Sequence, residues 1–592
     1  MFGTTIKENC GFTENNDKAF STSGDLCLDF FTRITRNAAL EDYVTAFVKA
    51  WNENKKTATQ IILNMRDVRN GKGEKLIPCV IMVYLKHKLE HNVYEAILRC
   101  MVNNGCWKDL LRIYEIDCRS SSAFPRYCAF PKYYPELQFI AKQLSEDELA
   151  LSQNNKAAIS LCAKWAPSEN THYDHHPINA ATEIRKLLNM SAKQYRLMLT
   201  KLRNHLNILE MLMSTQKYDQ IDFSKLPSVA HMKMRKAFCR DTNSEGIESD
   251  SRKKLHESYA DYLSKLKKGE TKVNVKGIQP HELVSTYLKY SGTHTSRKLF
   301  ETELDPLVEE QWKALLEKTM RSGAFRDVTA IVDVSGSMEG QPLEVAMALG
   351  ILVADCTKGP YHGQIISFHE KPTWHKITGV TLQDKVQSID DTPRGGSTDL
   401  RAVFNMILDN AKSADLAPEE MVKTLFVFTD MQFNKCDDGN WESTFEYARR
   451  VYQEAGYELP RIICWNLRTS ASKTLPVEQN EKGFAMLSGF SAELLKCVLT
   501  AQDITPYGMM LHVLEPYDVP QQVLDCGTVL NVDPNFCTHL KKAIEDSAIK
   551  KSFKPDAKIS TTGVTKGLRI SSRHRPWAQA LSSNSSSSDS SL

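Results

Sequence analysis

The sequence predicts a multidomain protein, with an α-helical, solenoid-like N-terminal region followed by an α/β domain built on a parallel sheet. The chain has 592 residues, more than a single hydrophobic core usually holds. Apolar residues recur at helical spacing up to about residue 320, and short buried strands then alternate with helices. We therefore divide the chain into an arm (1–24), a helical repeat-like domain (25–320), an α/β domain (321–520) and a C-terminal segment (521–592).

The composition is that of an ordinary globular protein. Charged residues make up 25% and hydrophobic residues 42%, and a net charge of +3 gives no overall attraction for polyanions. The 15 cysteines are odd in number and include no C-x-x-C pair, and the N-terminus lacks the apolar core of a signal peptide. These features predict reduced thiols in a cytoplasmic protein. The longest apolar run, Leu76–Leu85, is too short to span a membrane, so no membrane association is expected.

The first half of the chain is predicted to be helical after a disordered arm. Residues 1–24 are polar and rich in Asn, Thr and Ser. Residues 40–51 place their apolar side chains on one helical face, and turns at Arg69–Glu74 and Asn103–Trp107 separate such segments into hairpins that stack in solenoids. The first turn has two interpretations. Helix termination by Gly71 is favoured over phosphate contact by Arg69 and Lys72.

Two polar stretches of the helical region have both functional and structural interpretations. His172, His175 and His176 form a pattern that zinc would accept, but a solvated loop is favoured because no fourth ligand lies nearby. Residues 191–240 contain ten Lys or Arg against three Asp or Glu, with aromatic residues between them, as in RNA-binding surfaces. A solvated basic helix face is the alternative. The candidate RNA-binding residues are Lys201, Arg203, Lys233, Arg235 and Lys236.

An oxygen-rich turn lies between a strand and a helix after residue 327. Val328, Ala330, Ile331, Val332 and Val334 are small or β-branched, as in a strand buried on both faces. Asp333, Ser335 and Ser337 follow in the spacing D-x-S-x-S, and Gly336 permits a tight turn. Carboxylate and hydroxyl oxygens suit Mg²⁺, Mn²⁺ or Ca²⁺ better than zinc. The carboxyl end of such a strand is also where α/β sheets place ligands.

Three residues on one turn cannot complete the octahedral shell of Mg²⁺, so further oxygens must come from elsewhere. The glycine turn at residues 395–399 presents the hydroxyl of Thr398, and the apolar strand at residues 424–429 ends at the carboxylate of Asp430. The predicted cation site therefore consists of Asp333, Ser335, Ser337, Thr398 and Asp430.

These three segments resemble, in order and context, the metal-ion-dependent adhesion site of von Willebrand factor type A domains. The resemblance implies that Ser335, Ser337 and Thr398 bind the cation directly, and that Asp333 and Asp430 hold it partly through water. It also implies an open sixth position, to be filled by a carboxylate from a protein partner. A cation that only stabilises the fold is the alternative.

Other motifs resemble the family known as domain of unknown function 2828. They are Arg66–Glu74, Gly105–Leu111, Lys164–Ser168 and Tyr195–Arg203, with further matches at Leu425–Phe433 and Ser488–Ala492, so the resemblance extends over residues 25–520. More distantly, helical repeats followed by a von Willebrand domain resemble the Ro 60 kDa (TROVE-module) RNA-binding proteins. That resemblance rests on architecture and implies RNA only by analogy.

The α/β pattern continues beyond the oxygen-rich turn and then fades. Strands are predicted at Gln364–His369 and Arg461–Leu467, and helices at Leu400–Leu408, Phe445–Ala455 and Phe490–Leu499. A helix over 535–548 is followed by a Ser-rich end of the C-terminal segment, which by composition is predicted to be disordered.

Taken together, these features predict a non-enzymatic binding or scaffold protein that uses a divalent cation to hold an acidic side chain of a protein partner. The nucleophile motif G-x-S-x-G and the dinucleotide-binding motif G-x-G-x-x-G are both absent. Asp333 and Asp430 are expected to bind the cation, which makes them poor general bases. An RNA-binding ribonucleoprotein component is the second hypothesis. A Mg²⁺-dependent hydrolase is the third.

Overall fold

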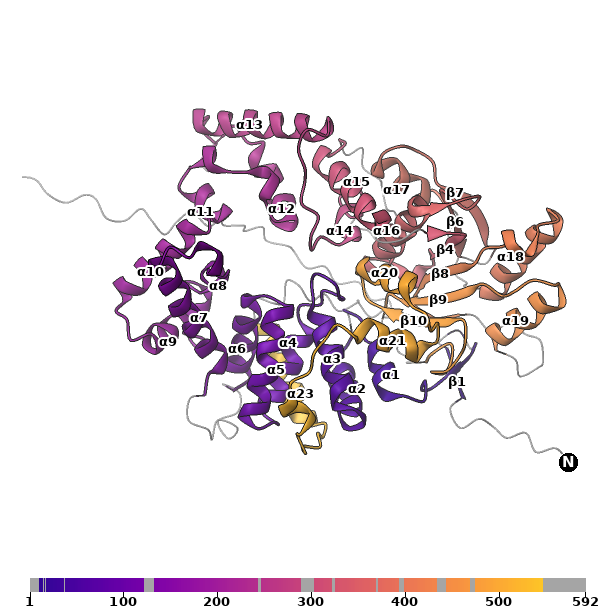
Figure 1. The fold of residues 1–592 in the computed structure, drawn as a ribbon, viewed down its shortest axis with the longest axis horizontal. Helices are drawn as coiled ribbons and strands as arrows, with labels where there is room; N and C mark the ends of the chain where they lie inside the picture. The colour runs from indigo at the N-terminus through magenta and orange to yellow at the C-terminus, as the bar shows by residue number, and fades with distance from the viewer. Residues whose placement is uncertain are drawn as a thin grey trace, which may run out of the picture.

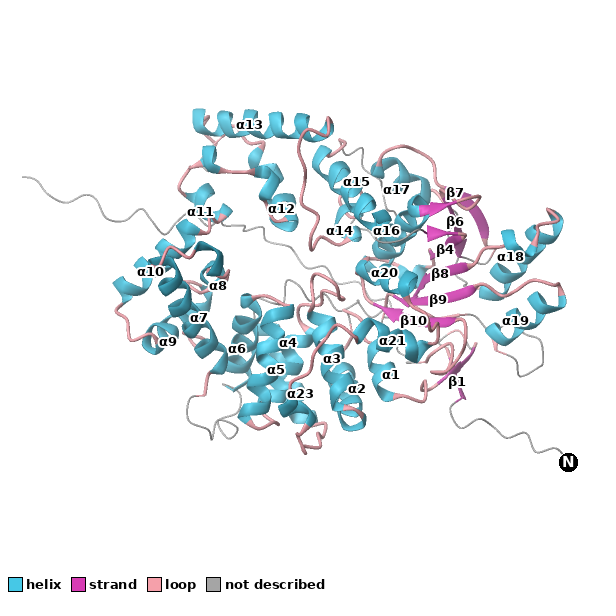
Figure 2. Ribbon diagram, viewed as in Figure 1, coloured by secondary structure: helices cyan, strands magenta, loops and turns pink. Residues whose placement is uncertain are grey.

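In the computed structural model, the described residues are 10–13, 15, 17–36, 38–121, 133–242, 246–288, 303–321, 325–368, 371–392, 399–433, 443–468 and 474–546. They form an N-terminal helical region and a C-terminal domain around a six-stranded sheet (Figures 1 and 2). The predicted multidomain architecture is confirmed at this level. Within these ranges, no helix combines the length and the hydropathy needed to cross a lipid bilayer.

The sheet has the strand order β10-β9-β8-β4-β6-β7, with β8 and β4 at its centre. Its strands are parallel except for β7, which pairs antiparallel with β6, so the prediction of a wholly parallel sheet is wrong at this edge. The connection over residues 369–372 is too short for the crossover that a parallel strand requires. The strands are β4 (Val328–Asp333), β6 (Gln364–Phe368), β7 (Thr373–Lys376), β8 (Thr424–Thr429), β9 (Arg461–Asn466) and β10 (Phe484–Ser488).

Helices pack closely on this sheet. Gly350 lets α16 approach β4, because a Cβ at this position would lie 2.5 Å from Cγ2 of Val332. Phe445 of α19 meets Phe484 of β10 edge to face, with ring centroids 4.6 Å apart. The helices are α16 (Gln341–Cys356), α17 (Leu382–Asp390), α18 (Leu400–Ser413), α19 (Thr444–Glu454), α20 (Glu493–Thr500) and α21 (Pro506–Leu514), and two short strands, β3 (Phe325–Arg326) and β5 (Thr357–Lys358), pair with each other.

In the helical region, helices that follow one another along the chain pack together. Asn54 ends α2, and its side chain accepts a hydrogen bond from the amide of Thr57 at the start of α3. Residues 77–85, most of the longest apolar run, are buried within α4. The helices are α1 (Leu26–Arg33), α2 (Leu40–Glu53), α3 (Lys55–Arg66), α4 (Ile77–Lys86), α5 (His91–Asn104), α6 (Trp107–Ser121), α7 (Pro135–Ser152), α8 (Cys162–Trp165), α9 (Ala180–Leu187) and α10 (Ala192–His205).

A second, smaller core lies under α11 (Leu209–Ser214), α12 (Ser228–Phe238) and α13 (Asp250–Lys267). At its centre, the ring of His231 is fully buried among Phe223, Phe238, Tyr259 and Tyr262. Burial lowers the pKa of His231 to about 4, so the imidazole is neutral at physiological pH. Helices α14 (Pro280–Val284) and α15 (Pro306–Arg321) then lead back to α16.

The two ends of the described chain are tied to distant parts of the molecule. The predicted disordered arm is wrong for residues 10–24, because β1 (Cys10–Phe12) and β2 (Lys18–Phe20) form a hairpin, and Thr13 donates to the carbonyl of Phe433 at 2.7 Å. The C-terminal segment does not stand apart either. Helices α22 (Gln521–Leu524) and α23 (Pro534–Asp546) pack on the helical region, where Trp51 Nε1 donates to Thr528 O. Residues 547–592, including the Ser-rich end, lie outside the described residues.

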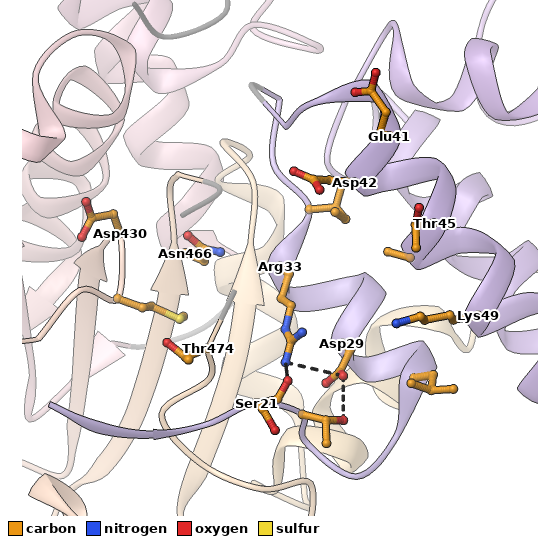
Figure 3. A pocket seen from close by; sticks show the side chains of 15 residues that line it. Ser21, Asp29, Arg33, Glu41, Asp42, Thr45, Lys49, Asp430, Asn466 and Thr474 are labelled. Atoms are coloured by element: carbon orange, nitrogen blue, oxygen red, sulfur yellow. Dashed lines mark hydrogen bonds and ion pairs between the residues drawn. The ribbon is translucent and has the colours of Figure 1, made fainter. Parts of the chain in front are cut away.

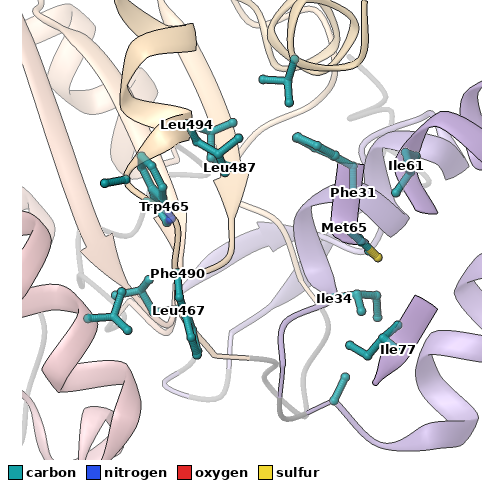
Figure 4. Packing of buried hydrophobic residues seen from close by; sticks show 14 of the residues in the cluster. Phe31, Ile34, Ile61, Met65, Ile77, Trp465, Leu467, Leu487, Phe490 and Leu494 are labelled. Carbon is teal, nitrogen blue, oxygen red and sulfur yellow. The ribbon is translucent and has the colours of Figure 1, made fainter. Parts of the chain in front are cut away.

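One continuous hydrophobic core joins the helical region to the sheet (Figure 4). Phe31 and Ile34, at the end of α1, face Leu487 and Phe490 at the end of β10 (Figure 4). Lys72 lies within this interface and is fully buried. Its Nζ donates to Phe31 O at 2.5 Å and to Ser488 Oγ at 2.7 Å, and desolvation lowers the pKa of Lys72 to about 7.

The Arg69–Glu74 turn has a structural role, but the predicted helix termination by Gly71 is wrong, because α3 ends at Arg66 with Asp67 as its C-cap. A Cβ on Gly71 would lie 2.0 Å from the carbonyl oxygen of Asn64, so only glycine fits where the chain folds back on α3. Arg69 NH1 donates to the carbonyl of Asn103. Arg69 and Lys72 are therefore both engaged within the protein.

Candidate cation site at the carboxyl edge of the sheet

The turn after β4 is organised around the carboxylate of Asp333. One of its oxygens accepts a hydrogen bond from the amide of Ser335 at 3.0 Å, and the other accepts one from the hydroxyl of Thr429 at 2.6 Å. A short 3₁₀ turn over Gly336–Met338 follows, and the hydroxyls of Ser335 and Ser337 are 3.1 Å apart. The D-x-S-x-S motif thus gathers three oxygen-bearing side chains at one point.

Asp430 lies beside this turn because β8 is the neighbour of β4 in the sheet. Its Oδ1 accepts a hydrogen bond from the amide of Gln432 at 3.1 Å. Between them, Met431 has a φ of 61°, in the left-handed region that non-glycine residues rarely adopt. The amide of Met431 donates to Thr429 Oγ1. Such local strain is often found at functional sites.

Electrostatics links the two carboxylates. Asp333 is 0% exposed and Asp430 is 3% exposed. Burial, and after it the negative charge of Asp430, raises the pKa of Asp333 to about 7. Among the described residues, no Lys or Arg forms an ion pair with Asp333. A divalent cation would neutralise both carboxylates, so this donor set fits a hard metal ion.

The structure therefore brings together four of the five predicted ligands, Asp333, Ser335, Ser337 and Asp430. Thr398 lies outside the described residues, and Asp399, beside it, caps α18 by accepting from the amide of Ala402. Sequence reasoning missed Thr429, although a Thr at the end of a buried strand, directly before a ligand, was the available signal.

The helical region covers part of this edge of the sheet. Asn466, at the end of β9, donates to the carbonyl of Thr32 at 3.0 Å, and Ser488, at the end of β10, donates to the carbonyl of Phe31 at 2.7 Å. Arg468, just beyond β9, donates to the carbonyl of Ser337 at 2.5 Å. The candidate cation site is thus connected to β9, and β9 to the end of α1.

A cavity of about 280 Å³ separates α1 and α2 from the carboxyl ends of β8 and β9 (Figure 3). Asp430 and Asn466 lie on the sheet side, and Asp42 and Thr45 lie on the side of α2, with Arg33 between them (Figure 3). Arg33 is committed to its own helix and loop, since it contacts Asp29 at 3.5 Å and donates to the carbonyl of Ser21 at 2.6 Å. The cavity borders the cation site through Asp430.

Comparison with known proteins identifies the chain. The profile "Domain of unknown function (DUF2828)" matches residues 13–124 and 134–325, and "Domain of unknown function (DUF7788)" matches residues 327–513. The chain belongs to the DUF2828 family. It is 52% identical over 563 residues to "Uncharacterized protein L728" of Acanthamoeba polyphaga mimivirus, covering 94% of this chain and 96% of that relative. In this DUF2828 protein, the DUF2828 match ends where the α/β domain begins, so the motifs at residues 425–433 and 488–492 fall within the DUF7788 match.

The basic residues predicted to bind RNA are divided between two roles in this DUF2828 protein. Arg203 donates to the carbonyls of Ala163 and Ala166 and to the hydroxyl of Ser168. Arg235 pairs with Asp305 at 2.5 Å. Both guanidinium groups thus hold the fold together. Lys201, Lys233 and Lys236 are exposed.

Other groups of potential metal ligands have structural explanations. In the part of the chain that the structure describes, only Asp25, Cys27 and Glu53 bring three such ligand atoms within 4.8 Å of one another. Asp25 caps α1, and Glu53 accepts hydrogen bonds from the amides of Leu26 and Cys27. His172 contacts Glu115 at 3.0 Å, and the described residues contain no zinc-type group that includes this histidine.

Proposed function

We propose that this protein is a non-enzymatic binding protein that holds a divalent cation, Mg²⁺ or else Mn²⁺ or Ca²⁺, at Asp333, Ser335, Ser337 and Asp430. Thr398 is the expected fifth ligand. The ligand captured at the remaining position would be a carboxylate, with an acidic side chain of a protein partner as the candidate. The supporting observation is the burial of two adjacent carboxylates together with two hydroxyls.

The fold supports this proposal through the position of the site. The oxygen-rich turn follows β4, which lies next to β8 at the centre of the sheet, and ligands of α/β sheets bind at the carboxyl ends of such strands. This arrangement agrees with the von Willebrand A interpretation of the domain, which we retain as part of the proposal. The cytoplasmic location expected from the cysteine pattern is retained with it.

Catalysis is the weaker proposal because the acidic groups are already engaged. Asp333 accepts hydrogen bonds from Ser335 and Thr429, and a bound cation would leave neither Asp333 nor Asp430 free as a general base. A hydrolase that uses the cation remains the competing proposal. It predicts turnover that Asp333→Asn abolishes.

The proposal is tested first by metal binding. Titration of Mn²⁺ into the protein, followed by electron paramagnetic resonance, should show one site whose affinity falls at least about tenfold in Asp333→Asn, since a charged ligand is lost. Asp415→Asn is the matched control, because Asp415 is an exposed residue of the same domain with a φ of 48° that Asn tolerates. Equal affinities in wild type and Asp333→Asn would refute the cation site.

Partner capture is tested separately. Proteins retained by the tagged wild type in Mg²⁺ should be lost in EDTA and in Asp333→Asn, but kept by Asp415→Asn. An identical set of retained proteins in all four samples would exclude a cation-bridged partner. The RNA-binding proposal predicts instead that RNA is retained in EDTA and released by salt.

A further inference from the structure

The cavity beside the candidate cation site has apolar walls on both of its sides. Leu26, Ile34 and Ala46 line it from the helical region, and Met431 lines it from just beyond β8, directly after Asp430. Figure 3 shows this space between α1 and α2 on one side and the sheet on the other. Apolar surface therefore lies next to a predicted cation ligand.

The cavity opens to solvent on the side of α2. Glu41 and Lys49 both line it, and both are exposed. On the side of the sheet, Asp430 is 3% exposed, and Asp333 of the neighbouring strand is 0% exposed. A ligand that enters past α2 therefore approaches two carboxylates that are buried from the outer surface.

The charges of the lining make the entry of a carboxylate depend on the cation. Arg33 is paired with Asp29 at 3.5 Å, so its charge is already compensated. The remaining charges are mostly negative, so they would repel a carboxylate, and a divalent cation beside Asp430 would offset this repulsion. The acidic lining residues are Asp29, Glu41, Asp42 and Asp430, and the basic ones are Arg33 and Lys49.

A flat protein surface cannot reach the buried carboxylates. The helical region is bonded to the sheet edge beside the cavity, where Asn466 donates to the carbonyl of Thr32 at 3.0 Å. The cavity holds about 280 Å³, slightly less than a typical small-molecule pocket of ~300–1,000 Å³. It therefore suits a narrow segment, such as the tip of a loop.

We propose that this cavity receives a protruding segment of the protein partner, in which an acidic side chain is followed by an apolar one. The acidic side chain binds the cation held at Asp333 and Asp430. The apolar side chain packs between Ala46 on α2 and Met431 beyond β8. This inference rests on the cation-dependent function proposed above, and it adds the helical region as the second wall of the binding site.

Short peptides with blocked ends test the ligand chemistry. The probes are Gly-Glu-Leu-Gly (the Leu peptide), Gly-Gln-Leu-Gly (the Gln peptide) and Gly-Glu-Ser-Gly (the Ser peptide). Each is added to the full chain with substoichiometric Mn²⁺, which broadens the NMR signals of a peptide bound beside it. The Leu peptide should be broadened, and the Gln peptide should not, because it lacks the carboxylate. The Ser peptide should bind about tenfold more weakly than the Leu peptide, because it buries less apolar surface.

Filling the cavity separates this inference from the cation site itself. Ala46→Leu should weaken binding of the Leu peptide at least about tenfold, because the added side chain occupies the space that the peptide needs. Its Mn²⁺ affinity, measured by electron paramagnetic resonance, should equal that of the wild type. Ala260→Leu is the matched control, since Ala260 is an exposed residue of α13. If thermal melting shows that Ala46→Leu does not fold, Thr45→Leu fills the same wall.

Three results would overturn the inference while the Mn²⁺ affinity stays intact. The first is no binding of the Leu peptide to the wild type, or equal binding to the wild type and the filled variants. The second is equal binding of the Leu peptide and either of the other two peptides. The third is binding of octanoate that Ala46→Leu blocks, with no binding of any peptide, which would assign the cavity to a small apolar carboxylate. A wild type that binds no Mn²⁺ would instead refute the cation site.

Discussion

The carboxyl edge of the sheet and the interface around Lys72 bury charge in opposite ways. At the sheet edge, the carboxylates of Asp333 and Asp430 are buried side by side, and a hydroxyl and backbone amides donate to their oxygens. At the interface, one ammonium group is buried, and it donates to Phe31 O and Ser488 Oγ. The first arrangement fits a bound cation, and the second is satisfied by hydrogen bonds within the protein.

The largest expected effect concerns the buried edge. Mg²⁺ at one hundred times its Kd should stabilise the wild type by about 2.7 kcal/mol and raise its Tm accordingly, because the cation binds only the folded protein. Asp333→Asn should show no such rise. In EDTA this variant should melt above the wild type, because one of two repelling buried charges is gone. A wild-type Tm that is the same in Mg²⁺ and in EDTA would mean that no Mg²⁺ binds at the sheet edge.

The rigidity of the edge depends on the packing of α16 beneath it. Gly350→Ala should destabilise the protein by about 1–3 kcal/mol, because the added Cβ meets the Val332 side chain in a filled core. Urea unfolding gives the comparison. Gly527→Ala is the control, since a Cβ there meets nothing within 4 Å. Equal stabilities of the two variants would mean that the helix and β4 can move apart without cost.

Lys72 makes the interface between the helical region and the sheet sensitive to pH. Its pKa is about 7 in the folded protein and 10.5 when unperturbed, so the unfolded chain binds more protons between these values. The contribution of Lys72 to stability is therefore complete above pH 10.5 and is lost as the pH falls towards 7, at up to about 1.4 kcal/mol per pH unit. Urea unfolding at pH 7.5 and 9.0 should show a larger gain for the wild type than for Lys72→Met. If the wild type and Lys72→Met gain the same stability between these pH values, the pH dependence comes from a group other than Lys72.

The two regions also differ in how far the sequence predicts them. Asp333, Ser335, Ser337 and Asp430 were predicted because each lies at the end of an apolar strand, and neighbouring parallel strands bring their ends together. Strands β4, β6, β8 and β9 were predicted because each is a short run of mostly apolar residues. The edge strands β7 and β10 were missed because their short runs carry no distinguishing pattern.

Nothing local marks the burial of Lys72. This lysine belongs to a turn, and only tertiary packing brings it against Phe31 and Ser488. The N-terminal hairpin was missed for a related reason. Its strands are only three residues long, and the turn between them is held by contacts such as Thr13 with Phe433 and Thr444 with Asp17, which join residues more than 400 positions apart.

The return of α22 and α23 to the helical region has a consequence for synthesis. These two helices cover surfaces of α2, α3, α5 and α6, which leave the ribosome hundreds of residues sooner. Until residue 546 has been translated, those apolar surfaces have no permanent cover and are open to aggregation or to chaperones. The helical region is therefore synthesised first, but its packing is complete only after α22 and α23 have been synthesised.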